Sequence, residues 1–108
     1  MTVDYLSQLY YLRQEAEVER RRLQEVEDGP ETAEIRDIME NRLRRVEEQR
    51  DKIEAYIDAV EDIIVHTALK LRCEQLLPWR KIALSLGGRI CPQTVRVTVS
   101  RYVLKHPL

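Results

Sequence analysis

Residues 23–34 read LQEVEDGPETAE, and the Asp28-Gly29-Pro30 step within them is the one clear break in the first 70 residues. Glycine favours the position just past a helix end, and proline favours the first turn of the following helix. Apolar side chains recur at helical spacing on both sides of the step. The stretch therefore predicts two helices joined by a short loop, and a short loop makes such helices antiparallel neighbours.

The apolar side chains around this turn recur every seven residues, which is typical of a narrow helical seam. Before the turn they are Tyr5, Leu9, Leu12, Ala16, Leu23 and Val26, with Glu19 as the interruption. After the turn they are Ile35, Met39, Val46, Ile53, Tyr56, Val60 and Ile63, with Arg42 and Gln49 as interruptions. We therefore predict an all-α protein with a coiled-coil-like helical hairpin over residues 1–60, whose second helix continues to about residue 72.

Further apolar positions widen the stripe of each predicted helix beyond what one partner helix can cover. They are Leu6, Tyr10, Leu43, Ile57 and Ile64. A homodimer built as a four-helix bundle would cover them, and we predict this assembly. The alternative is that they pack against the C-terminal part of the same chain.

Charge is divided between the two ends of the chain. The 108 residues carry a net charge of −1, but residues 1–65 hold ten Lys/Arg and eighteen Asp/Glu. Residues 66–108 hold eight Lys/Arg against Glu74 alone. This polarity indicates an acidic assembly region joined to a basic surface that meets a polyanion. No uncharged run approaches the roughly 20 residues that a membrane helix needs, so we expect no membrane partner.

The basic region predicts two more helices. Residues 78–88 read PWRKIALSLGG, in which Pro78 starts a short helix and the two glycines end it. Residues 89–103 read RICPQTVRVTVSRYV, and the alternation over residues 95–103 alone is typical of a strand. We favour a helix, because Pro92 starts a helix well and no second strand is available for pairing. A short helix, a glycine turn and a second helix form a helix-turn-helix over residues 61–108, with Trp79 expected to be buried beneath the last helix.

This pattern resembles a known group of proteins over residues 72–102. The residues that carry the resemblance are Arg72, Leu77, Trp79, Ile82-Ala83, Leu86-Gly87-Gly88, Val95-Arg96 and Arg101-Tyr102. They are similar to the C-terminal helix-turn-helix of small phage-encoded proteins that look like region 4 of sigma factors, among them the RinA/ArpU-type regulators of phage late genes. The resemblance implies a phage or prophage transcription regulator that binds specific DNA sequences in the cytoplasm of a bacterial host. It leaves a contact with RNA polymerase open.

The predicted last helix presents its outer face to double-stranded DNA. The side chains expected to reach base edges are Gln93, Thr94, Arg96, Val97, Ser100 and Arg101. Four further basic side chains are expected to hold phosphates, which position a protein without specifying a sequence. They are Arg80, Lys81, Arg89 and Lys105.

Three other functional classes fit the sequence less well. A phage small terminase subunit also joins a helix-turn-helix to assembly helices, although its DNA-binding part usually comes first. Glu31-x-x-Glu34 with Glu48-x-x-Asp51 resembles the magnesium motif of all-helical nucleotide pyrophosphohydrolases, but the heptad turns these carboxylates outward. A purely structural coiled coil would leave the C-terminal pattern without a purpose. The few Ser, His and Cys residues form no nucleophile–base pair, zinc spacing or disulfide framework, so we expect no catalytic residue, metal or cofactor.

Overall fold

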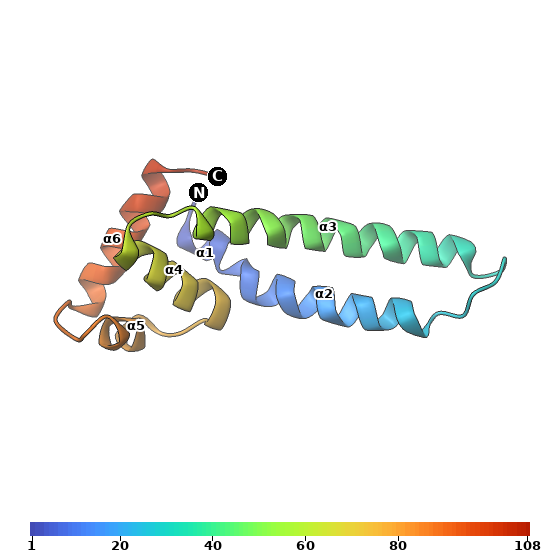
Figure 1. The fold of residues 1–108 in the computed structure, drawn as a ribbon, viewed down its shortest axis with the longest axis horizontal. Coiled ribbons are helices and arrows are strands. Elements are labelled where there is room, and N and C mark those ends of the chain that lie inside the picture. Colours follow the sequence, from blue (N-terminus) through green and yellow to red (C-terminus); the bar gives the residue numbers. More distant parts are fainter.

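The computed structural model describes all 108 residues and contains helices but no strand, as predicted. The helices are α1 (Val3–Leu6), α2 (Gln8–Glu25), α3 (Ala33–Asp58), α4 (Ile63–Gln75), α5 (Trp79–Ser85) and α6 (Pro92–Lys105). The molecule measures 60 × 25 × 18 Å. Figure 1 shows that α2 and α3 form a long arm, whereas α1, α4, α5 and α6 gather at the end that also holds both termini.

The turn between α2 and α3 lies at the predicted position. The Thr32 hydroxyl donates to the carbonyl of Glu27 at 2.5 Å and to that of Gly29 at 3.1 Å. The Arg36 guanidinium donates to the Val26 carbonyl at 2.7 Å and pairs with the Asp28 carboxylate at 2.8 Å. These contacts hold the loop closed, and α3 begins at Ala33 rather than at Pro30.

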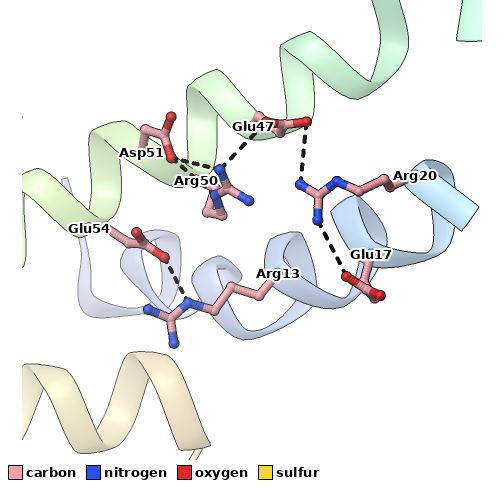
Figure 2. A network of polar contacts seen from close by, with 7 residues as sticks. All are labelled: Arg13, Glu17, Arg20, Glu47, Arg50, Asp51 and Glu54. Atoms are coloured by element: carbon pink, nitrogen blue, oxygen red, sulfur yellow. Dashed lines mark hydrogen bonds and ion pairs between the residues drawn. The ribbon is translucent and has the colours of Figure 1, made fainter. Parts of the chain in front are cut away.

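The central part of the α2–α3 pair packs along the predicted apolar seam, but Tyr5, Ile35 and Ile63, which were also predicted to line it, are exposed. Charged side chains flank the seam. Leu9, Leu12 and Ala16 of α2 and Val46 and Ile53 of α3 are buried. Figure 2 shows the flanking polar network, in which arginines of each helix meet carboxylates of the other or of their own helix. The residues drawn are Arg13, Glu17, Arg20, Glu47, Arg50, Asp51 and Glu54.

Glu19 explains how an acid can interrupt the seam. Its side chain is buried, and one carboxylate oxygen lies 3.5 Å from an Arg22 nitrogen and 3.6 Å from an Arg42 nitrogen. A buried charge needs such partners because the loss of its hydration is otherwise too costly in free energy. Arg42 is one of the two residues that interrupt the apolar row of α3, so these two interruptions, Glu19 and Arg42, face each other and compensate.

The prediction that the second helix continues to about residue 72 is wrong. The helix ends at Asp58, and the chain turns through Ala59–Asp62 before α4 begins at Ile63. The Asp62 carboxylate accepts hydrogen bonds from the backbone N–H groups of Ile64 at 3.0 Å and Val65 at 3.1 Å. An N-terminal cap of this kind favours the start of a new helix. Asp62 therefore separates α4 from α3, although the apolar pattern continues across it.

Helix α4 is the centre of the molecule because it packs against each of the other helices. Its residues Val65, Ala68, Leu69 and Cys73 are buried in one hydrophobic cluster that reaches from α1 and the α2–α3 pair to α6. The two ends of the chain therefore share a core.

This core covers two of the apolar side chains that were predicted to lie at a dimer interface. Leu6 and Ile57 are fully buried within the single chain, so the expectation that they need a second copy is wrong. Helix α4 covers that side of the α2–α3 pair, and α4 and α6 cover α1, which agrees with the alternative of packing within the same chain. Tyr10 and Leu43 remain half-buried, and Ile64 is 37% exposed.

The two cysteines should differ strongly in reactivity. Cys73 is fully buried, whereas Cys91 is exposed. Burial disfavours the thiolate and raises the pKa of the Cys73 thiol to about 11. A thiol reagent at pH 8 should therefore modify one cysteine in the folded protein and both after unfolding, as counted by mass spectrometry. In Cys91→Ser the folded protein should react only slowly, and rapid modification of both thiols in the native wild type would contradict this core.

Candidate nucleic-acid interface

Three backbone features set the directions of α5 and α6. Leu76 ends α4 in the left-handed conformation with φ of 52°, and Pro78 then starts α5. Gly87 and Gly88 have φ of 102° and 71°, values that a residue with a side chain rarely adopts. The Gly88 N–H donates to the Ala83 carbonyl at 3.0 Å, which closes the end of α5. The loop then leads to Pro92, and residues 92–105 are helical rather than extended, as predicted.

The inner face of α6 is apolar and holds the helix against the core. Val95, Val99 and Val103 are buried there, in the same cluster as Ile82 and Ala83 of α5. Fixing one face of α6 in this way determines which side chains point outward.

Trp79 is half-buried and packs against the edge of the core cluster, so the expectation that it is largely buried beneath α6 holds only in part. The Arg72 guanidinium lies 5.3 Å from the centre of the indole ring and donates to the Leu77 carbonyl at 2.9 Å. A cation over an indole face is attractive, and here it takes the place of apolar cover. The loss of stability in Trp79→Ala should accordingly be smaller than the roughly 3–5 kcal/mol of a fully buried tryptophan.

The outer face of α6 presents the side chains that were expected to reach DNA bases. Gln93, Thr94, Arg96 and Arg101 are exposed, whereas Val97 and Ser100 are half-buried. The four side chains assigned to phosphates are all exposed, with two on α5, one in the loop before α6 and one at the end of α6. They are Arg80, Lys81, Arg89 and Lys105.

Four of the predicted base-contacting residues also line a groove along α6. Its remaining walls come from the N-terminal segment and from the region around Trp79, and its volume is about 470 Å³. We call it the α6 groove, and its lining residues are Met1, Thr2, Val3, Asp4, Arg72, Trp79, Arg96, Val97, Ser100, Arg101 and Leu104. No sequence pattern indicates that residues 1–4 belong here, because only the packing of α1 against α6 brings them close.

The ion pairs of the chain are distributed unevenly. All ten use arginines between Arg13 and Arg50; nine join them to carboxylates of α2, α3 or the turn between these helices, and one joins Arg13 to Glu74 of α4. None uses one of the eight basic residues in 66–108. The positive charge of the C-terminal end is therefore free to act on an external polyanion.

The start of α6 is incompletely capped, and this can be tested. Cys91 occupies the N-cap position without a side-chain hydrogen bond to the helix. A serine hydroxyl at this position can accept from the N–H of Gln93 or Thr94, so Cys91→Ser should raise the free energy of unfolding by about 1 kcal/mol. Urea titration measures the change, and Cys91→Ala serves as the control that should give no gain. Equal stability of the two variants would contradict the cap assignment.

The carboxylates of the pyrophosphohydrolase-like motif lie apart from any enclosed site. Glu31, Glu34, Glu48 and Asp51 are all exposed. No group of three or more His, Cys, Asp or Glu residues is placed to hold a metal ion. No helix combines the length and apolar character that a membrane crossing requires.

Comparisons of the chain with protein-family models, with curated proteins and with solved structures give no match.

Proposed function

We propose that the chain is a sequence-specific DNA-binding protein that regulates transcription, of the phage or prophage kind that the resemblance implies. In this proposal α5, the glycine-containing loop and α6 act as a helix-turn-helix. The observation that carries it is the unpaired positive charge at one end of the molecule, where exposed side chains of α5 and α6 are basic and the only acid of residues 66–108 is Glu74.

In the proposed complex the N-terminal half of α6 lies in the major groove, where base edges are distinguishable. Arg96 is the side chain suited to a guanine, because its guanidinium can donate twice to O6 and N7. Gln93 suits an adenine, and Thr94 or the exposed part of Val97 suits a thymine methyl group. Ser100 and Arg101, one turn later, extend this contact.

The proposed phosphate contacts surround this face. Arg80 and Lys81 lie in the first turn of α5, the helix that crosses the DNA backbone in this motif. Arg89 precedes α6 and Lys105 ends it. The acidic α2–α3 pair would be repelled by the same phosphates, which favours the orientation with the basic end toward DNA.

Selection of bound duplexes from random DNA tests the proposal directly. The wild-type protein should enrich a short consensus at moderate salt. The matched control is the triple variant Gln93→Ala, Arg96→Ala and Arg101→Ala, whose changed side chains are exposed and should leave the fold intact. Recovery of no consensus by wild type, or of the same consensus by the control, would contradict sequence reading by α6.

A transcription assay separates regulation from DNA packaging. The selected site is placed beside a bacterial promoter, and transcripts are counted with and without the protein. A regulator should change the transcript level from this template and leave a template with a scrambled site unchanged. Specific binding without any change in transcription would favour a packaging protein such as a small terminase subunit.

We also propose that the protein acts as a homodimer joined through the α2–α3 pair. Apolar side chains remain exposed there on both helices, namely Tyr11, Val18, Ile35 and Ile38. Sedimentation at micromolar concentration should show a dimer.

The variant Ile38→Glu should sediment as a monomer, because burying its charge at an interface is unfavourable. Ile38 is 62% exposed in the single chain, so the variant should still fold, as circular dichroism can check. A monomeric wild type would contradict the proposed assembly.

A further inference from the structure

The α6 groove has the size and the mixed lining of a small-molecule site. Its volume of about 470 Å³ falls within the range of natural ligand pockets. Apolar side chains from three parts of the chain line the groove, namely Val3 of α1, Trp79 of α5, and Val97 and Leu104 of α6. A flat apolar group would therefore find apolar contacts from more than one element.

The groove is also positively charged. Arg96 and Arg101 line one wall, and neither forms an ion pair within the chain. Arginine guanidinium groups match phosphate oxygens in a two-point geometry. Asp4 is the only acid among the lining residues and adds an acceptor from the N-terminal segment.

Trp79 is held in place before any ligand arrives. Arg72 lies 5.3 Å from the centre of its ring, and the same guanidinium is fixed by its hydrogen bond to the Leu77 carbonyl. An indole with a fixed orientation loses little freedom when a second aromatic ring packs against it, and such preorganisation favours binding. Aromatic side chains of this kind accept any nucleobase, since every base has a flat π-face.

We propose that the α6 groove binds a free mononucleotide. The base packs against Trp79, and Arg96 and Arg101 hold the phosphate. The Asp4 carboxylate accepts from a ribose hydroxyl or an exocyclic amine. Inorganic phosphate alone would leave the apolar lining unused and would place its negative charge near the Asp4 carboxylate, so a complete nucleotide fits the groove better.

A regulatory consequence rests on the proposed DNA-binding function. Arg96 and Arg101 cannot contact a bound nucleotide and the bases of a duplex at the same time. The mononucleotide should therefore compete with DNA and act as a small-molecule effector that releases the protein from its site.

The single tryptophan of the chain provides the measurement. Its fluorescence is excited at the red edge of indole absorption, where adenine does not absorb, and adenosine 5′-monophosphate is titrated into the full-length protein. Saturable quenching is expected, with much weaker responses to adenosine and to inorganic phosphate. Arg96→Gln and Arg101→Gln should each weaken binding by about tenfold, the loss expected for one charged hydrogen-bonding contact.

Arg89→Gln is the matched control, because it removes the same charge outside the groove and should leave nucleotide affinity unchanged. Absence of saturable quenching, or equal weakening by Arg89→Gln, would overturn the site. A response only to a 5′-phosphorylated single-stranded oligonucleotide would assign the groove to DNA and overturn the effector role. Saturable nucleotide binding by a protein that binds no duplex would uphold the groove and contradict the proposed function, so the two proposals can fail separately.

Discussion

Leu69→Ala should lower the free energy of unfolding by about 2–5 kcal/mol, the range for a buried leucine truncated to alanine. Leu69 is fully buried in α4, the helix that packs against all the others. Urea unfolding is followed by circular dichroism, which reports the long helices, and by Trp79 fluorescence, which reports α5. Both signals should shift together, because one hydrophobic cluster joins the two ends of the chain.

Leu84→Ala is the control for this prediction. Leu84 is also a helical leucine but is 66% exposed, so its truncation should change stability by no more than about 0.5 kcal/mol. Two separate transitions in Leu69→Ala, with fluorescence lost first, would show that the C-terminal helices unfold on their own. That result would contradict the shared core.

Arg96→Ala should weaken binding to the selected duplex by about 1–3 kcal/mol and relax the preference at one base pair. The reason is its position on the outer face of α6, where the side chain is exposed and has no carboxylate partner in the chain. Titration of specific and scrambled duplexes measures the two effects. On the scrambled duplex the loss should be smaller, since no guanine contact is made there.

Lys81→Ala is the comparison that separates base reading from phosphate binding. Lys81 lies on α5 and is exposed. Its loss should weaken all duplexes similarly and reduce the salt dependence by about one unit per phosphate contact. If both variants lost the same affinity on both duplexes, Arg96 would be a phosphate contact and the proposed recognition face would be wrong.

The parts of the fold that the sequence predicts well depend on local signals. Gly29 and Pro30 mark the turn, and Pro92 marks the start of the last helix in spite of the alternating residues after it. Each of these residues acts on its own backbone within a few positions, so its effect can be read without knowledge of the rest of the chain.

The corner before α4 has a local signal that the apolar repeat obscures. Asp62 precedes two isoleucines, which is a helix start, but Val60 and Ile63 continue the apolar repeat across it. The repeat therefore predicts one helix. A capping residue inside an unbroken pattern can decide the structure because it satisfies backbone N–H groups that a new helix leaves unpaired.

Long-range packing has no such local signal. Leu6 and Ile57 are covered by helices distant in sequence, and Trp79 lies beside Arg72 as well as beside α6. The same limit applies to the candidate site. The outer face of α6 follows from helical periodicity, but the participation of Asp4 depends on α1 lying beside α6 and has no signature in either segment.

The corner between α3 and α4 holds the α2–α3 arm at a fixed angle to α4. Asp62 fixes the start of α4, and His66 Nδ1 donates to the Ile57 carbonyl at 2.9 Å, so the two helices are bonded across the bend. A dimer joined through its α2–α3 arms would hold the two proposed DNA-binding ends at a fixed separation and angle. Since DNA turns once in about 34 Å, adding half a turn between half-sites would rotate one of them to the opposite side of the duplex. Operator spacing would then be measured in whole helical turns.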